Sequence, residues 1–414
     1  VSMITKAERI KKDITTIAQF QSKKGRGCNR FSYTPAFRQA ADYIAEEMKK
    51  AGLTVRENAV GAILGTLQGE QPELAPVVSG SHLDSVPEGG NFDGIAGICT
   101  ALEAARAFHD VGIRPRRPFC CIAIPEEEGP QFGSGLFGIR AMCGQLYDDE
   151  IHRFRNAQGQ SIAEVLTAYG KNPEKIASET IHTGDWAAFL ELHIEQGPVL
   201  DREHLELGIV EAIVGLKYYF VTIKGISNHA GATPMTMRAD TVLAMANAVS
   251  AGADTALTLG DGTVFTTGII QTHPGAGNII PDKTVFSIDC RSRNMNSIET
   301  VMKAVKASLE TSKKQNPGLS YAIEERLHAD PVEMDQSLQN LLETQTQMLH
   351  IPYKRMCSGA GHDTMVFNHL MPTAMIFVPS RDGRSHVPEE WTDYRYIQQG
   401  AEVLYQTLRQ LTAQ

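Results

Sequence analysis

Side chains that bind metal ions stand beside the end of an apolar segment near residue 80. His82 and Asp84 follow the mostly apolar run 74–78, and Asp93 comes shortly after them. In an extended chain, residues two apart point the same way, so Asp84 can orient the ring of His82. A histidine, its orienting carboxylate and a further carboxylate at Asp93 make half of a metal site.

Three further apolar segments, 118–124, 187–194 and 373–379, end in or lead to residues of the same types. Three consecutive glutamates at the end of a buried strand are costly to gather unless they face water or a cation. A mixed set of histidines and carboxylates suits zinc, manganese or cobalt, and the size of the set suits two ions that share a carboxylate. The candidate ligands are His82, Asp93, Glu127 or Glu128, His193 and His386.

The elements around these residues predict an α/β domain with an open mixed sheet. Residues 118–124 are apolar on both faces, as in a buried parallel strand, and with the strand before residue 82 and a helix over 94–112 they form a β–α–β unit. Thr34 and Pro35 mark the start of another helix, which ends at Gly52. All the candidate ligands follow strands, where open α/β sheets bind their ligands.

The pattern changes between residues 212 and 328. Two helices and four strands are expected there in the order β–α–β–β–α–β, which is typical of a compact α+β domain. The predicted elements are strand 216–224, helix 240–256, strands 262–272 and 284–293, helix 297–315 and strand 319–327. The sequence therefore predicts a core domain made of residues 1–211 and 329–414, interrupted by an inserted domain.

The composition excludes several classes of partner. A net charge of −9 over 414 residues argues against nucleic acid and anionic membranes. No apolar run looks long enough to span a bilayer, and no signal-peptide pattern opens the chain. The seven cysteines are scattered, odd in number and without a Cys-x-x-Cys pair, which favours the cytoplasm.

Together these segments resemble the dinuclear metallopeptidase superfamily that includes aminoacylases and glutamate-releasing carboxypeptidases, and within it the amidase/hydantoinase/carbamoylase branch. The resemblance covers nearly the whole chain. His193 is its sharpest mark, because peptidase members usually carry a carboxylate at that position. The segments that carry the resemblance are 29–34, 80–85, 90–94, 126–129, 191–197, 229–235, 358–363 and 385–391.

The resemblance implies a role for each candidate ligand. Asp93 would bridge the two ions, with His82 and His193 at one ion and Glu128 and His386 at the other. Asp84 would orient His82 from behind. Glu127 would be the general base that takes a proton from the attacking water and returns it.

The resemblance also implies residues that contact the substrate. His229 and Asn278 of the inserted domain would reach the reacting carbonyl, with His229 supplied by the partner subunit of a homodimer. Arg291 would hold a substrate carboxylate through its guanidinium fork. The remaining expected substrate contacts are Gln196, Gly359 and Ala360.

We therefore expect a cytoplasmic, homodimeric amidohydrolase with two divalent ions that cleaves the linear C–N bond of an N-carbamoyl (ureido) acid. N-carbamoyl-L-amino acids are the first expected substrates, then allantoate, then β-ureidopropionate and ureidoglycolate. Gln131 and Ile139 stand where many relatives carry arginine and serine, which leaves the substrate open. His193 argues against a dipeptidase or aminoacylase. Glu127 argues against a non-catalytic binding homologue, because binding alone needs no general base.

Overall fold

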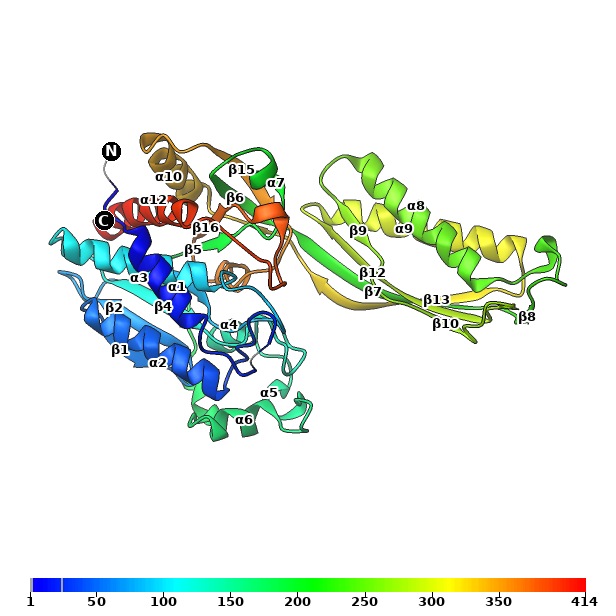
Figure 1. The fold of residues 1–414 in the computed structure, drawn as a ribbon, viewed down its shortest axis with the longest axis horizontal. Helices are drawn as coiled ribbons and strands as arrows, with labels where there is room; N and C mark the ends of the chain where they lie inside the picture. The colour runs from blue at the N-terminus through cyan, green and yellow to red at the C-terminus, as the bar shows by residue number, and fades with distance from the viewer. Residues whose placement is uncertain (1–2, 24) are drawn as a thin grey trace. The chain divides into compact units, whose positions relative to one another are not determined.

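The computed structural model describes residues 3–23 and 25–414, which fall into two compact units (Figure 1). Unit 1 comprises Val1–Glu211 and Met334–Gln414, and unit 2 comprises Ala212–Glu333. The sequence placed the end of the inserted domain at residue 328. Unit 2 runs five residues further, because the short strand β14 (Val332–Glu333) returns to pair with Ala212 and Ile213 at its start.

The frame of unit 1 is a mixed sheet to which nine strands contribute in the part of the chain that the structure describes. Their order is β1-β2-β4-β3-β5-β16-β6-β14, and β15 pairs with β6. The strands are β1 (Thr54–Glu57), β2 (Ile63–Leu67), β3 (Val77–His82), β4 (Phe119–Ile124), β5 (Ala188–Ile194), β6 (Leu207–Ile213), β15 (Tyr353–Ser358) and β16 (Thr373–Val378).

Four neighbouring strands in the middle of this sheet, β4, β3, β5 and β16, run parallel. Every residue of the four is buried, as expected for parallel strands covered on both faces. The outer strands β1, β2 and β6 pair antiparallel, so the sheet is mixed as the sequence predicted. Because the four central strands are parallel, their carboxyl ends meet at one edge.

Helices cover both faces of the sheet. One apolar cluster joins the sheet to α1 (Ala7–Ile17), α2 (Pro35–Lys50), α3 (Ile95–Asp110), α10 (Gln336–Met348) and α12 (Tyr394–Thr412). Thr34 caps α2 as predicted, accepting the amide of Phe37 at 3.3 Å. On the other face lie α4 (Phe137–Met142), α5 (Glu150–Arg153), α6 (Ile162–Ala168), the 3-10 helix η1 (Pro173–Glu179) and α11 (Thr364–Phe367). None of these short elements was predicted, because each is too short to show a helical period.

Unit 2 has an antiparallel sheet, in the order β10-β12-β7-β13 with β9 beside β12, and two long helices that pack together. The predicted single strand 262–272 is two strands, since residues 267–269 leave the ladder. The elements are β7 (Gly215–Lys224), β8 (Asn228–His229), α8 (Thr241–Leu259), β9 (Val264–Thr266), β10 (Ile270–His273), β11 (Ile279–Ile280), β12 (Lys283–Ser292), α9 (Met295–Gln315) and β13 (Ser320–Ala329).

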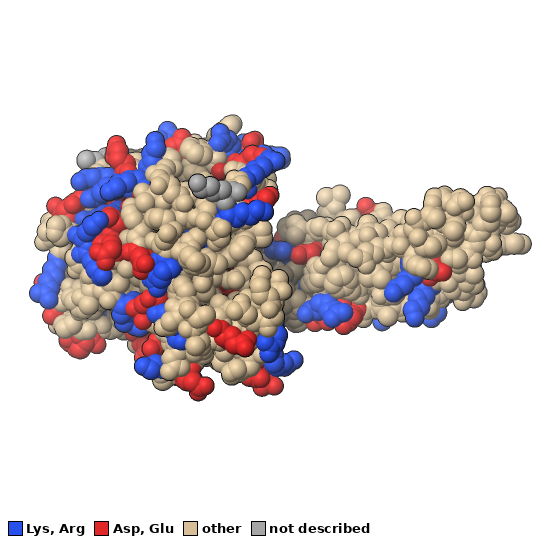
Figure 2. Space-filling model, turned by 60° about the horizontal axis from the view of Figure 1, so that its bottom comes forward, with Lys and Arg blue, Asp and Glu red and all other residues tan. Residues whose placement is uncertain are grey.

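The surface of unit 2 carries many exposed apolar side chains. Leu243 and Leu257 of α8 are exposed, and Figure 2 shows long stretches of this unit without charged side chains. By length and composition α8 could cross a bilayer, the one such helix among the described residues, with 28% of its apolar window buried. The expectation that no segment reaches that length and apolarity is therefore wrong for α8, although a helix lying on a sheet passes the same test.

A buried ion-pair network joins α1, α2 and α3 beneath the sheet. Arg106 contacts the fully buried Asp13 at 2.5 Å and Glu47 at 2.6 Å. We expect Arg106→Met to lower the free energy of unfolding by roughly 3–5 kcal/mol, because it leaves the fully buried Asp13 without its cation, whereas Glu47 keeps its pair with Lys50. The exposed pair Arg155–Glu164 gives the control, where Arg155→Met should cost less than about 1 kcal/mol. Equal urea-unfolding midpoints for the two variants would contradict this assignment.

Candidate metal centre

The four central parallel strands supply the candidate ligands from one edge. His82 is the last residue of β3, and His193 is the next-to-last residue of β5. Glu127 and Glu128 follow β4, and His386 lies in the loop after β16. Because parallel strands end at a common edge, segments more than 300 residues apart in the chain meet there.

Asp93 reaches this edge because Gly94 follows it. Gly94 has φ +68°, and a Cβ atom there would lie 2.4 Å from the carbonyl oxygen of His82 and 2.6 Å from its ring. Glycine alone therefore allows the start of α3 to approach β3 so closely. Glu390 fixes the same segment by accepting the amides of Phe92 at 2.9 Å and Asp93 at 3.1 Å.

Three loops at this edge contain a non-glycine residue in the left-handed region. Glu126 after β4, Gln196 after β5 and His386 after β16 have φ of +55°, +59° and +58°. Such conformations cost about 1–3 kcal/mol each and concentrate at functional sites, where the surrounding structure holds them. The strain turns the chain back so that the side chains face the common edge.

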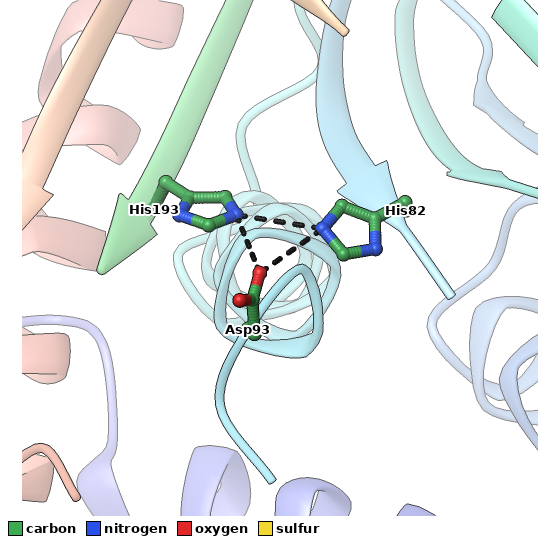
Figure 3. Close-up of side chains that lie close together, drawn as sticks. All are labelled: His82, Asp93 and His193. Carbon is green, nitrogen blue, oxygen red and sulfur yellow. Dashed lines mark hydrogen bonds and ion pairs between the residues drawn. The ribbon is translucent and has the colours of Figure 1, made fainter. Parts of the chain in front are cut away.

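One group of three donors consists of His82, Asp93 and His193 (Figure 3). The Nε2 atoms of His82 and His193 lie 3.2 and 3.1 Å from Oδ1 of Asp93, and 3.5 Å from each other. Both rings therefore direct the same nitrogen toward one point, beside one carboxylate oxygen.

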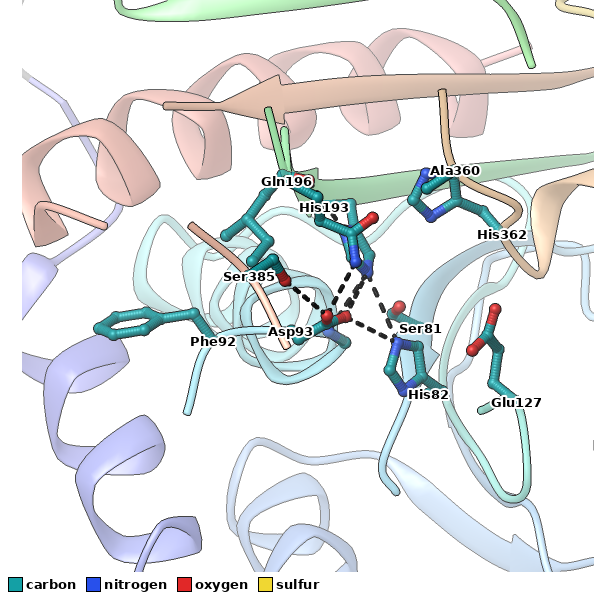
Figure 4. Close-up of polar contacts among 12 residues, drawn as sticks. Ser81, His82, Phe92, Asp93, Glu127, His193, Gln196, Ala360, His362 and Ser385 are labelled. Atoms are coloured by element: carbon teal, nitrogen blue, oxygen red, sulfur yellow. Dashed lines mark hydrogen bonds and ion pairs between the residues drawn. The ribbon is translucent and has the colours of Figure 1, made fainter. Parts of the chain in front are cut away.

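A second group uses the other oxygen of the same carboxylate. Nε2 of His386 lies 3.2 Å from Oδ2 of Asp93 and 3.4 Å from Oε1 of Glu128. Gln196 donates through Nε2 to this Oδ2 at 2.8 Å, and Ser385 donates through its hydroxyl at 3.0 Å. Figure 4 shows Gln196 and Ser385 on one side of Asp93, and Glu127 on the side of His82.

These donors fit divalent cations. Asp93 presents one oxygen to each group, which is the arrangement of a carboxylate shared by two ions. Oε1 of Glu128 is buried and accepts no hydrogen bond from the described residues, and a buried acceptor of this kind needs a partner. Imidazole nitrogens with carboxylate oxygens suit zinc, manganese or cobalt.

The carboxyl groups differ in their electrostatics. Burial, together with the neighbouring carboxylates Glu128 and Asp363, raises the pKa of Glu127 well above its ordinary value, although His82 opposes this. Burial and Asp93 raise the pKa of Glu128 to about 7. Burial also acts to raise the pKa of Asp93, but hydrogen bonds from three histidines hold it well below its ordinary value. Of these three carboxyl groups, Asp93 is therefore the one whose charged form the surroundings favour.

Asp84 holds a loop as well as facing a histidine. Its carboxylate accepts the amides of Glu127 and Glu128, both at 3.1 Å. Nδ1 of His82 lies 3.2 Å from the backbone carbonyl oxygen of Asp84 and 3.8 Å from its carboxylate. The backbone carbonyl is thus the nearer acceptor for the ring that Asp84 was expected to orient.

The predicted substrate contacts divide between the two units. Gln196, Gly359 and Ala360 lie in unit 1, and Ala360 is drawn beside His362 in Figure 4. In unit 2, the amide of Ala230, next to His229, donates to the carbonyl of Asn278 at 3.0 Å, and Arg291 is paired with Asp289. Of the two departures, Gln131 donates to the carbonyl of Ser32, and Ile139 is fully buried.

Several residues at this edge were missed by sequence reasoning. All but the half-buried Ser385 are buried, and they lie among the residues above, but no spacing rule identified them. They are Ser81, Glu191, His362, Asp363, Ser385 and Glu390. The alternation of residues 191, 193 and 195 in β5 was a signal for Glu191, since it points the same way as His193.

The fold and the donor set together define a class, the metallopeptidase-like hydrolases that depend on metal ions. The chain belongs to Peptidase family M20/M25/M40, whose sequence profile matches residues 78–410. It is 39% identical over 405 residues to an N-carbamoyl-L-amino-acid amidohydrolase of Paenarthrobacter aurescens, covering 98% of each chain. It is 33% identical to an allantoate amidohydrolase of Escherichia coli (strain K12), again covering 98% of each.

A solved structure agrees with these relatives. An amidase of the hydantoinase/carbamoylase family from Burkholderia multivorans superposes with a TM-score of 0.92 at 28% identity, covering 99% of this chain and 98% of that one. The resemblance expected from the sequence is thus confirmed at the level of family and of the mixed α/β fold.

Substitutions of the two neighbouring glutamates, Glu127 and Glu128, should differ in their effect on metal binding. We expect Glu128→Gln to weaken retention of manganese, zinc or cobalt, because Oε1 of Glu128 belongs to the second donor group, 3.4 Å from Nε2 of His386. Glu127→Gln should retain the metal but lose about two to four orders of magnitude in turnover, the range for a general base. Metal content after dialysis, measured with turnover on the same sample, checks both. Opposite results for the two variants would exchange their roles.

Proposed function

We propose that this chain is a metal-dependent amidohydrolase that cleaves the C–N bond of N-carbamoyl-L-amino acids, giving the amino acid, carbon dioxide and ammonia. The observation that carries the proposal is full-length similarity to N-carbamoyl-L-amino-acid amidohydrolases at 31–39% identity together with a complete donor set that includes His193. Allantoate is the second candidate substrate, because an allantoate amidohydrolase is 33% identical over the same span.

The metal centre in this proposal comprises two divalent ions. His82 and His193 would hold one, Glu128 and His386 the other, and Asp93 would contribute one oxygen to each. Bound ions would polarise the substrate carbonyl and make water acidic enough to attack it near neutral pH. Zinc, manganese and cobalt all suit these donors.

Glu127 would move the proton. It lies on the His82 side of the centre, and its backbone amide is fixed by the carboxylate of Asp84. With its position set by the loop, the Glu127 carboxylate can take a proton from the attacking water and give it to the leaving nitrogen. Gln196, held to Asp93 at 2.8 Å, and the turn at Gly359 and Ala360 would contact the substrate beside it.

Arg291 would recognise the substrate carboxylate. Its Nε and Nη2 atoms donate to the two carboxylate oxygens of Asp289 at 2.8 and 2.9 Å, and this pairing fixes the plane of the guanidinium. A guanidinium held in this plane can donate two parallel hydrogen bonds to a substrate carboxylate as a second bidentate pair. An ammonium cannot form such a pair.

Arg291 and His229 lie at opposite ends of unit 2. Arg291 is opposite Leu216, whereas the loop to His229 leaves β7 after Lys224, about 26 Å further along the strand. Figure 1 shows β9, which pairs with Arg291, and β8, which carries His229, at the two ends of this unit. A ureido acid is far shorter than this separation. One copy of unit 2 therefore cannot offer both residues to the same substrate molecule.

This separation supports a homodimer in which each site uses Arg291 of one chain and His229 with Asn278 of the other. The surface of unit 2 supports the same assembly. Ten of the fourteen large apolar side chains that are exposed among the described residues belong to this unit. Exposed apolar area of this kind marks interaction sites, and the edge strand β10 offers unpaired backbone groups to a second copy.

We propose a cytoplasmic location for this dimer. All seven cysteines are thiols, and six of them are buried. Scattered thiols in apolar surroundings suit a reducing compartment. The net charge of −9 supports a small-molecule partner rather than nucleic acid or a membrane surface.

The substrate assignment is tested by comparing an N-carbamoyl-L-amino acid with its carboxamide analogue and with allantoate. The enzyme should prefer the carbamoyl acid to its amide by about one to two orders of magnitude in kcat/KM, the amount that charge-assisted hydrogen bonds contribute. Arg291→Lys should lose this preference more than its rate on the amide, because a point charge cannot form the bidentate pair. Equal treatment of acid and amide by both proteins would overturn the role of Arg291. Faster release of ammonia from allantoate would favour the second candidate.

Sharing of the site is tested by mixing two inactive chains. His229→Ala and Glu127→Gln homodimers should each be inactive, whereas mixed dimers should regain up to half of the wild-type activity per dimer, because one of their two sites is intact. Mixing Glu127→Gln with Glu128→Gln gives the control, since both changes affect unit 1 and no intact site can form. Purified mixed dimers without activity would favour a site built from one chain.

A further inference from the structure

We infer that Glu191 is a positioning residue that fixes the turn between Ser358 and Thr364 against the metal-binding strand β5. The inference rests on the proposed function in one respect, that Gly359 and Ala360 of this turn contact the substrate. Nothing about the role of Glu191 follows from the metal donors themselves, because Glu191 is not required in either group at Asp93.

The carboxylate of Glu191 connects three elements. It is 1% exposed, and its Oε1 accepts the hydroxyl of Ser81 in β3 at 2.6 Å. Its Oε2 accepts the hydroxyl of Thr364 at 2.6 Å and the amide of Thr364 at 3.3 Å. Ser81 precedes His82, and Glu191 itself lies two residues before His193, so the strands that carry two candidate ligands are tied to the start of α11.

The start of α11 depends on this contact. Asp363 occupies the capping position but makes no capping hydrogen bond with its side chain. Glu191, in strand β5, accepts the amide and the hydroxyl of Thr364 instead. Charge-assisted hydrogen bonds to a backbone amide are stronger than neutral ones, and here the acceptor is shielded from water. The end of the turn is thus held by β5 rather than by its own sequence.

A second contact fastens the same turn to the same strand. The ring of His362 packs edge-on against the ring of His193, with centroids 4.5 Å apart and planes at 62°. Nε2 of His362 lies 2.9 Å from the hydroxyl of Ser358, which also accepts the amide of Ala360 at 3.2 Å. Figure 4 shows Ala360 and His362 next to His193. The turn is therefore fixed internally and attached to β5 at two points.

A further metal ion is the other use for this cluster, since Glu191, His193 and His362 have donor atoms within 4.8 Å of one another. The hydrogen bonds argue against it. Both oxygens of Glu191 already accept hydroxyl or amide donors, and Nε2 of His362 is engaged by Ser358. The geometry of the cluster is that of a support for the turn.

Two small changes test the support. Thr364→Val keeps the shape of the side chain and removes its hydroxyl, and Glu191→Gln keeps the shape and removes the charge. Each should raise KM for the N-carbamoyl amino acid roughly tenfold, the order that loss of a charge-assisted hydrogen bond permits. Metal content should stay at the wild-type level, and Thr364→Ser should restore KM. In the double variant the two effects should be less than additive, because both remove the same interaction.

Glu402 provides a matched control outside the site. It is fully buried and accepts the amide of Thr5 at 2.9 Å and the Thr5 hydroxyl at 2.8 Å, the same donors that Glu191 receives from Thr364. Glu402→Gln should lower the melting temperature about as much as Glu191→Gln but leave KM unchanged. If Glu191→Gln also lowers only the melting temperature, or loses metal instead of raising KM, the inference is overturned.

A measurement independent of turnover separates this inference from the proposed function. Amide hydrogen exchange of a peptide spanning residues 356–366 should be at least several-fold faster in Glu191→Gln and Thr364→Val than in wild type or Glu402→Gln, because the turn opens more often. Unchanged exchange in both variants would overturn the inference. Absence of wild-type turnover on every ureido acid would instead overturn the proposed function, and the exchange result would still decide the role of Glu191.

Discussion

The structure depends on one electrostatic constraint, the gathering of carboxyl groups at a single edge of the sheet. Seven are buried there, and Glu127 and Glu128 are partly buried beside them: Asp84, Asp93, Glu126, Glu191, Glu195, Asp363 and Glu390. Uncompensated, so many acids away from water would be strongly unfavourable. Their pKa values record the conflict, since burial raises those of Glu126, Glu127 and Asp363 well above the ordinary range. Cations resolve such a conflict more completely than three histidines can.

Some of these carboxylates are candidate metal ligands, and others accept hydrogen bonds from backbone amides. Asp84 accepts two amides of the loop with Glu127, and Glu390 accepts two amides of the segment with Asp93. Glu195 accepts two amides at the start of α7 (Val199–Arg202), and Glu191 accepts the amide and the hydroxyl of Thr364 at the start of α11. Each of these acids holds a loop that carries a candidate ligand or substrate contact. About half of the acidic edge is thus scaffolding that sets the geometry of the other half.

This division accounts for which features were predictable from the sequence and which were not. The buried parallel strands were predicted because a short, unbroken apolar run is typical of a strand covered on both faces, and the candidate ligands were found because they follow those runs. Whether a given acid faces a cation or an amide depends on contacts such as that of Glu390 with Asp93, nearly 300 residues apart. Local patterns carry no such information. The short helices between residues 137 and 179 were not predicted for the same reason. They are stabilised by packing in the apolar cluster and are too short to show a helical repeat of apolar residues.

In unit 2 the constraint is the length of strand β7, which separates Arg291 from His229. The ten-residue strand β7 pairs with β12 along its whole length and with β13 over residues 216–224, so its two ends cannot approach one another to enclose a small molecule. Any reaction that needs Arg291 and His229 together must therefore bring in a second copy of the unit. Exposed apolar side chains such as Leu257 of α8 are a second reason to expect a partner surface on this unit. Catalytic need and surface chemistry thus favour the same assembly independently of one another.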